Sequence, residues 1–106
     1  MTKALLEEGV DCTAIFAISD SLAIGAVRAL IDAGKRVPMD ISVAGFDGTE
    51  MAAYYNPSIT TIRQPAETMA KETIKLLFDS IKKKTNVQQL IFEGELVPGE
   101  SVKKLN

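Results

Sequence analysis

The residues best suited to chemistry are two short polar clusters, each placed directly after an apolar run. Ser19-Asp20 follows the run Thr13–Ile18, and Asp47-Gly48-Thr49 follows the run Ile41–Phe46. In an open parallel sheet the carboxyl ends of the strands meet at one edge, where ligands bind. Carboxylates at that edge are fixed acceptors for the hydroxyl groups of a polyol or sugar. The same residue types also cap helices and shape turns, and the residues alone favour capping over ligand contact at both aspartates.

The sequence lacks the side chains on which most hydrolytic and metal-dependent chemistry relies. It has no histidine and a single cysteine, Cys12, which excludes His-dependent triads, ordinary zinc sites and disulfide frameworks. Ser19 has no nearby base that could deprotonate it. The turn Gly45–Gly48 lacks the glycine spacing and the lysine of a phosphate-binding loop. We therefore expect a protein that is not an enzyme and that holds no metal or cofactor.

Alternating helical and extended patterns surround the two polar clusters. A short helix, Thr2–Glu8, precedes the first apolar run, which is typical of a strand buried on both faces of a parallel sheet. A second helix with an apolar face follows from Leu22 to Ile31 and ends at Gly34. The second apolar run completes a strand–helix–strand unit, and Thr49 then begins a short helix. Such a unit joins parallel neighbours through a right-handed crossover, so the sequence predicts an α/β fold with a parallel sheet.

The second half of the sequence contains one long amphipathic pattern. A β-branched run, Ile59–Ile62, leads to Pro65, which is well placed at the start of a helix that we expect to extend to Lys84. One face of this helix is apolar and comprises Ala66, Met69, Ala70, Thr73, Ile74, Leu77, Phe78 and Ile81. Short strands are expected at Leu90–Phe92 and Glu95–Val97, before a polar tail.

Composition is typical of a small globular domain without a nucleic-acid or membrane surface. The chain has 106 residues, of which 46% are apolar, and its 12 basic and 14 acidic residues give a net charge of −2. That balance lacks the positive field that neutralises phosphates. No run approaches the roughly 18 consecutive apolar residues of a membrane span, and no apolar signal region follows Met1–Lys3. We therefore expect a reduced, cytoplasmic setting and no membrane partner.

Several motifs occur in a characteristic order between Thr13 and Pro65. They are Asp20 after the first strand, Ala23-Ile24-Gly25-Ala26, Val37-Pro38, Asp40-Ile41-Ser42, the Gly45-Phe46-Asp47 corner and the segment Pro57–Gln64 with Thr60-Thr61-Ile62. Together they resemble the LacI/GalR family of bacterial transcription regulators. The resemblance implies a periplasmic-binding-protein-like fold of type I, in which two α/β subdomains close on an effector behind a separate helix-turn-helix head.

This chain resembles only the carboxyl-terminal part of that effector-binding domain, and the resemblance implies how it divides. Residues 1–64 correspond to the core of the carboxyl-terminal subdomain. Residues 65–92 correspond to a crossover helix and strand that normally lie in the amino-terminal subdomain, and residues 93–106 correspond to a return strand and tail. The resemblance therefore implies a truncated fold, and we expect the apolar stripe of the long helix to dock on another copy of the chain.

The resemblance also implies which residues contact the effector. The positions that match Asp47 and Gln64 commonly line or border the effector cleft in the family. Ser19 and Asp20 match the corner after the first strand. The family often has an asparagine in place of Ser19, so the family's hydrogen bonds to the effector are not carried over to that corner. The effector is expected to be a small molecule of the carbohydrate class. Because half of the cleft is missing, this chain is expected to bind it weakly or not at all.

The same resemblance implies a homodimer. In the family the helix matching Leu22–Leu30 and the segment around Tyr55–Ile59 commonly form the dimer contact, which gives Ile24, Val27, Arg28 and Tyr55 as expected interface residues. Core packing is the competing explanation for the three apolar side chains, whereas an arginine on an apolar face is more typical of an interface. The resemblance further implies that DNA is contacted only through a head domain, which we expect to lie outside this chain.

Two functions remain open at this point. The first is effector sensing and dimerisation in a LacI/GalR-type regulator, where binding shifts a two-state equilibrium that the DNA-binding head reads out. The alternative is a fragment of a periplasmic sugar-binding protein of an ABC transporter, which has the same two-lobed fold. The segment Thr60–Pro65 favours the regulator.

Overall fold

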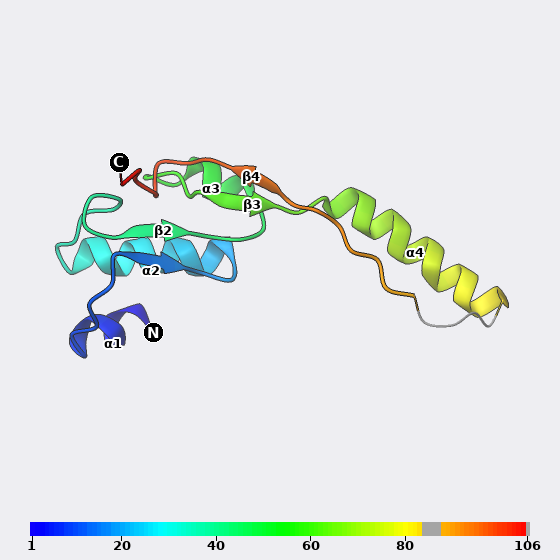
Figure 1. Ribbon diagram of the computed structural model, residues 1–106, viewed down its shortest axis with the longest axis horizontal. Helices are drawn as coiled ribbons and strands as arrows, with labels where there is room; N and C mark the ends of the chain where they lie inside the picture. The colour runs from blue at the N-terminus through cyan, green and yellow to red at the C-terminus, as the bar shows by residue number, and fades with distance from the viewer. Residues whose placement is uncertain (84–87, 106) are drawn as a thin grey trace. The chain divides into compact units, whose positions relative to one another are not determined.

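The computed structural model of the chain describes residues 1–83 and 88–105, and the chain divides into two compact units (Figure 1). The first unit joins Met1–Arg63 to Leu96–Asn106, and the second spans Gln64–Glu95. These divisions lie within a few residues of the boundaries that the sequence predicts at 64/65 and 92/93. The assignment of the second unit to a neighbouring subdomain stays a prediction.

Helices and strands alternate along the chain, as the sequence predicts. The elements of the first unit are α1 Thr2–Glu7, β1 Ala14–Phe16, α2 Asp20–Asp32, β2 Ser42–Ala44, α3 Glu50–Tyr54 and β3 Thr61–Arg63. They are followed by α4, Ala66–Lys83, and by β4, Glu95–Val97. β1 and β2 are shorter than the apolar runs that contain them, because the ladder between them comprises only three residue pairs.

β1 and β2 pair as parallel strands, which confirms the predicted strand–helix–strand unit. In the register of this pair, Ile15 lies opposite Val43. On the other side of β2, a parallel bridge joins Ala44 to Thr60, just before β3. β3 in turn pairs with β4. Because β1 and β2 are parallel and Ala44 is bridged in parallel to Thr60, the carboxyl ends of β1, β2 and β3 lie at the same edge.

The core of the first unit is formed by one face of α2 and the strands beneath it. Ala23, Val27 and Leu30 are spaced three and four residues apart and are fully buried. They belong to one apolar cluster with Val43 and Ile59. The prediction that Val27 is an interface residue is therefore wrong, because its exposed fraction is 0% and it offers a partner no surface.

The segment after β4 is bonded to the sheet, where the sequence predicts only a polar tail. Ser101 is fully buried. Its carbonyl accepts from the N–H of Val43 at 2.8 Å, and its N–H donates to the carbonyl of Ser58 at 3.0 Å. Its hydroxyl donates to the carbonyl of Val43 at 2.5 Å and accepts from the N–H of Thr60 at 2.9 Å. Ser101 thus supplies backbone partners that a neighbouring strand would otherwise provide.

In the second unit, α4 carries the predicted apolar stripe and leaves much of it exposed. The exposed fractions are 54% for Ile74, 57% for Leu77, 55% for Phe78 and 66% for Ile81. The predicted end of this helix, Lys84, lies outside the described residues. Within residues 1–83 and 88–105, no helix is both long enough and apolar enough to cross a membrane.

The strand predicted at Leu90–Phe92 is wrong. The backbone there is irregular, and the exposed fraction of Ile91 is 87%. A short apolar run becomes a strand only when a neighbouring strand satisfies its backbone groups. The described part of the second unit offers this segment no such neighbour.

Candidate binding site at the ends of the strands

The two polar clusters predicted from the sequence lie next to each other at one edge of the sheet. The N–H of Asp20, after β1, donates to the carbonyl of Phe46, after β2, at 2.8 Å. The loop after β2 continues beside β3, where the N–H of Asp47 donates to the carbonyl of Ile62 at 2.9 Å. Asp47 also forms a parallel bridge with Arg63. The predicted convergence of the two clusters is therefore confirmed.

Asp20 is fully buried at this edge, with an exposed fraction of 0%. Its Oδ2 accepts from the N–H of Thr49 at 2.7 Å and from the hydroxyl of Thr49 at 3.0 Å. Its Oδ1 accepts from the hydroxyl of Thr61 at 2.5 Å. A carboxylate without exposed surface cannot contact an effector, so the predicted effector contact of Asp20 is not compatible with this structure. Asp20 instead bonds the loop after β2 to β3 through Thr49 and Thr61.

Burial and hydrogen bonding act in opposite directions on the pKa of Asp20. Burial disfavours the charged form and by itself would raise this pKa. The hydrogen bonds from Thr61, Thr49 and the N–H of Gly48 together outweigh burial, so the pKa of Asp20 lies below its ordinary value of 3.8. The carboxylate is therefore ionised at neutral pH, which strengthens each of these hydrogen bonds.

Two glycines allow the loop after β2 to approach its neighbours closely. A Cβ at Gly45 would lie 2.6 Å from Oδ1 of Asp20, and a Cβ at Gly48 would lie 2.5 Å from Cα of Arg63. Gly48 also has a φ of 77°, which residues with a Cβ rarely adopt. Close backbone packing thus explains the glycines of the Gly45–Gly48 turn without any bound phosphate.

Ser19, Asp47 and Gln64 each keep part of their surface exposed. Ser19 caps α2 as predicted, with its Oγ accepting from the N–H of Leu22 at 3.2 Å. Asp47 has a φ of 132°, an unfavourable region for a residue with a Cβ. Gln64 directly follows β3 and is the first residue of the second unit. Contact between these three residues and an effector stays a prediction.

Sequence reasoning identified Asp20 but missed both threonines that bind it. Thr49 was expected only as the cap of α3, a role confirmed by the hydrogen bond from the N–H of Ala52 to its Oγ1 at 3.3 Å. Thr61 was expected only as part of a β-branched run. Its exposed fraction is 3%, and a buried hydroxyl needs a partner. A hydroxyl within an apolar strand was therefore the one available signal.

The three remaining predicted interface residues lie on α2 and at the end of α3. Ile24 and Tyr55 are half-buried and pack against the core cluster. Arg28 forms an ion pair with Asp32 at 3.0 Å, and 70% of the Arg28 side chain is exposed. All three have surface that a partner could cover, and their role in a dimer stays a prediction.

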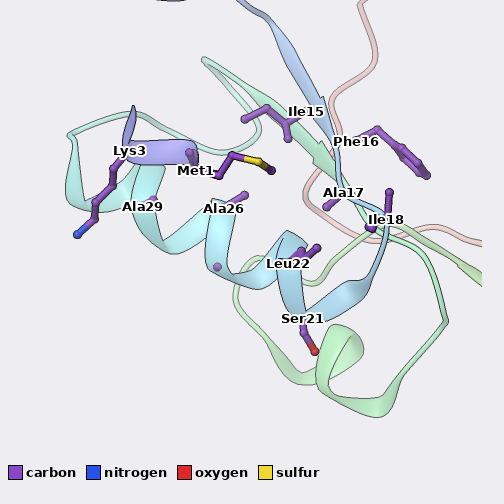
Figure 2. A pocket seen from close by; sticks show the side chains of 12 residues that line it. Met1, Lys3, Ile15, Phe16, Ala17, Ile18, Ser21, Leu22, Ala26 and Ala29 are labelled. Carbon is purple, nitrogen blue, oxygen red and sulfur yellow. The ribbon is translucent and has the colours of Figure 1, made fainter. Parts of the chain in front are cut away.

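The first unit also contains an apolar groove of about 470 Å³, shown in Figure 2. Residues of α1, β1 and α2 line it, including Met1, Phe16 and Leu22. None of the four predicted effector residues is part of its wall. A smaller hollow of about 260 Å³ borders the loop after β2, with Gly48 and Thr49 in its lining.

The chain matches known proteins over nearly its whole length. Residues 2–102 match the family model described as a periplasmic binding protein-like domain. The chain is 48% identical over 97 residues to the HTH-type transcriptional regulator MalR of Clostridium butyricum, which covers 92% of this chain and 29% of that protein. The chain therefore spans less than a third of the length of this relative.

Two solved structures of regulators share the fold. The lac repressor dimer bound to operator and the anti-inducer ONPF has a TM-score of 0.87 at 32% identity, over 95% of this chain and 35% of that chain. The transcriptional regulator CelR in complex with cellobiose has a TM-score of 0.86 at 37% identity, over 94% of this chain and 31% of that chain. These matches confirm the predicted α/β fold with parallel strands. The chain belongs to the periplasmic binding protein-like domain family.

Proposed function

We propose that this chain is the effector-sensing and dimerisation part of a LacI/GalR-type transcription regulator. The observation that carries the proposal is the edge where the loops after β1 and β2 meet beside β3, with Ser19 and Asp47 partly exposed. Ligands of open α/β sheets bind at such an edge. The matched relatives include an HTH-type regulator and a repressor bound to its operator, which supports a role in transcription.

Asp47, Ser19 and Gln64 are the residues that we propose contact the effector. A carboxylate, a hydroxyl and an amide can each form hydrogen bonds with the hydroxyl groups of a sugar. The complex of CelR with cellobiose supports a carbohydrate as the class of effector. Asp20 is left out of this set because its carboxylate is fully buried.

A regulator is favoured over the transport protein that the sequence left open. The HTH-type regulator MalR is 48% identical to this chain, and the lac repressor and CelR share its fold. A regulator acts on DNA in the bacterial cytoplasm, so a cytoplasmic location and the absence of enzymatic activity are parts of the proposal. DNA contact is assigned to a head domain outside this chain, because a net charge of −2 provides no attraction for phosphates.

Dimerisation is assigned to α2 and the end of α3, through Ile24, Arg28 and Tyr55. The ion pair between Arg28 and Asp32 is exposed to solvent, so exchanging it for a contact with a partner has a small free-energy cost. Arg28→Glu is expected to shift the chain towards monomer in sedimentation velocity experiments. An unchanged sedimentation profile for a dimeric chain would remove Arg28 from the interface.

An NMR titration of the ¹⁵N-labelled chain with cellobiose and a panel of other mono- and disaccharides tests the effector site. We expect shifts of the backbone amides of Ser19, Asp47 and Gln64 at millimolar sugar, with weak affinity. Asp47→Ala is expected to abolish these shifts. Asp32→Ala, which removes an exposed carboxylate from the far end of α2, is the matched control and is expected to preserve them.

Two results would contradict parts of this proposal. A micromolar affinity in calorimetry would show that the chain needs no further wall to bind sugar tightly. The absence of shifts at all three amides with every sugar, even at high millimolar concentration, would exclude sugar binding at the ends of the strands.

A further inference from the structure

The loop after β2 is fixed by hydrogen bonds at four consecutive residues, each to Asp20 or to β3. Two of these bonds are to Asp20: the carbonyl of Phe46 accepts from its N–H at 2.8 Å, and the N–H of Thr49 donates to its Oδ2 at 2.7 Å. The other two are to β3: the N–H of Asp47 donates to the carbonyl of Ile62 at 2.9 Å, and the N–H of Gly48 donates to Oγ1 of Thr61 at 3.3 Å. The backbone of this loop is thus held on both sides of Asp47.

Asp47 lies in the middle of this loop with a φ of 132°. Non-glycine residues keep such a conformation only where the surrounding structure determines it, and these conformations cluster at ligand-binding sites. The four hydrogen bonds are the local cause, because a change of φ at Asp47 would move the neighbouring N–H and carbonyl groups away from their partners. The direction of the Asp47 carboxylate therefore depends on the partners of this loop.

The hydroxyl of Thr61 bonds both to Asp20 and to the loop after β2. It donates to Oδ1 of Asp20 at 2.5 Å and accepts from the N–H of Gly48 at 3.3 Å. The exposed fractions of Thr61 and Asp20 are 3% and 0%. Water therefore has little access to replace the hydrogen bond between Thr61 and Asp20 if the hydroxyl is removed.

We propose that Asp20 and Thr61 are positioning residues, which hold the loop after β2 in the conformation that presents Asp47 at the edge of the sheet. Neither touches the effector, since both are buried. The effect on sugar binding rests on the proposed function, whereas the effect on the conformation of Asp47 does not.

Thr61→Val and Thr60→Val form a matched pair of variants for the test. Valine keeps the shape of threonine and removes the hydroxyl. Thr60 is the preceding residue, and its Oγ1 accepts from the N–H of Gly99 at 2.9 Å. Both variants thus lose a hydrogen bond between a hydroxyl and a backbone N–H, but only Thr61→Val loses one to the loop after β2. Thr61→Ser restores a hydroxyl at the same position.

The readout is the three-bond coupling between the amide proton and the α proton of Asp47, which is small at a φ of 132°. We expect this coupling to increase in Thr61→Val, to stay unchanged in Thr60→Val and to return to its original value in Thr61→Ser. Asp20→Asn, which turns an acceptor into a donor facing other donors, is expected to increase it as well. An unchanged coupling in Thr61→Val, or an equal change in Thr60→Val, would overturn the proposal.

The titration with cellobiose provides the second readout. Where the original chain binds, Thr61→Val is expected to weaken the shift of the Asp47 amide several-fold and Thr60→Val is expected to leave it unchanged. An increased Asp47 coupling in Thr61→Val together with an undiminished shift of the Asp47 amide would overturn the positioning role. If the original chain binds no sugar, the proposed function fails, and the coupling constant still decides whether Asp20 and Thr61 hold the loop.

Discussion

The two units of this chain contain helices with similar apolar faces and very different burial. In the first unit, α2 places Val27 and Leu30 in the core with exposed fractions of 0%. In the second unit, α4 leaves Leu77 and Phe78 with exposed fractions of 57% and 55%. Both faces follow the same three- and four-residue spacing. An amphipathic pattern therefore encodes a helix and the face that it must bury, but it does not encode what covers that face.

Truncating a leucine in each unit gives the largest expected contrast. Leu30→Ala should lower the free energy of unfolding by about 2–5 kcal/mol, because it leaves a cavity in the core. Leu77→Ala should lower it by less than about 1 kcal/mol, because the side chain is already largely exposed. Urea denaturation followed by circular dichroism measures both. Equal losses would mean that α4 is covered in solution.

We expect another copy of the chain to cover the apolar stripe of α4, and this stays a prediction. Leu77→Glu, which puts a charge in the middle of the stripe, should then reduce self-association in sedimentation velocity experiments. Arg28→Glu provides the comparison, because it changes the proposed contact on α2 and leaves α4 intact. A monodisperse monomer of the original chain at micromolar concentration would count against docking of the stripe.

The buried carboxylate gives the second-largest expected effect. Asp20→Ala should lower the free energy of unfolding by about 2–4 kcal/mol, because the buried hydroxyl of Thr61 and the N–H and hydroxyl of Thr49 lose their acceptor. Asp32→Ala removes a carboxylate from the opposite end of α2, where its ion pair with Arg28 is exposed. That control should cost less than about 1 kcal/mol. Similar losses would show that the Asp20 network adds little to the first unit.

Alanine substitutions of two glycines should have opposite effects on the stability of the first unit. Gly48→Ala should destabilise the first unit by about 1–3 kcal/mol, because its φ is 77° and its new Cβ would lie 2.5 Å from the backbone of Arg63. Gly25→Ala should instead stabilise it by about 0.5–1 kcal/mol, because Gly25 lies inside α2 with no atom within 4 Å of the added Cβ. Thermal melts of the two variants should therefore move in opposite directions.

The smallest effect is expected in the dependence of stability on pH. The pKa of Asp20 is lower in the folded chain than its ordinary value of 3.8. Its contribution is therefore fully present well above pH 4 and is lost as the pH falls through the lower, folded pKa. Urea denaturation at a series of pH values measures this loss of stability at acidic pH, the acid limb of the profile. Asp20→Asn should make the acid limb less steep.

Asp40 is the control for the pH series, because its pKa is also lowered. The side-chain hydrogen bond from Arg36 is the main cause, followed by the hydrogen bond from the N–H of Arg36. The pair is exposed, so Asp40→Asn should leave most of the acid limb unchanged. A larger change for Asp40→Asn than for Asp20→Asn would show that the hydrogen bonds to the buried Asp20 stabilise the fold less than an exposed ion pair does.

The sequence predicts those parts of the fold that depend on local pattern. The apolar runs around Ile15 and Val43, with a helix between them, were sufficient for a parallel pair, and the structure has these two residues opposite each other. Ser19 and Thr49 cap α2 and α3 as expected. These features depend on a few neighbouring residues, so a short stretch of sequence contains the necessary information.

The parts that could not be predicted depend on residues far apart in the sequence. The acceptor role of Asp20 requires Thr61, which is 41 residues away. A short apolar run at Leu90–Phe92 has strand propensity but finds no paired neighbour in the described part of its unit. Val27 satisfies the pattern of a core residue and of an interface residue equally, and only the packing of the sheet against α2 decides between them.

The burial of Ser101 has a consequence for how the chain is synthesised. Ser101 follows Val43 by 58 residues, and both hydrogen-bonding groups of the Val43 backbone bond to it. At translation rates of about 5–20 residues per second, the ribosome needs roughly 3–12 s to make the intervening chain. During that interval the nascent chain presents a hydrophobic strand whose backbone is open on one side, the kind of surface that molecular chaperones bind and that drives aggregation.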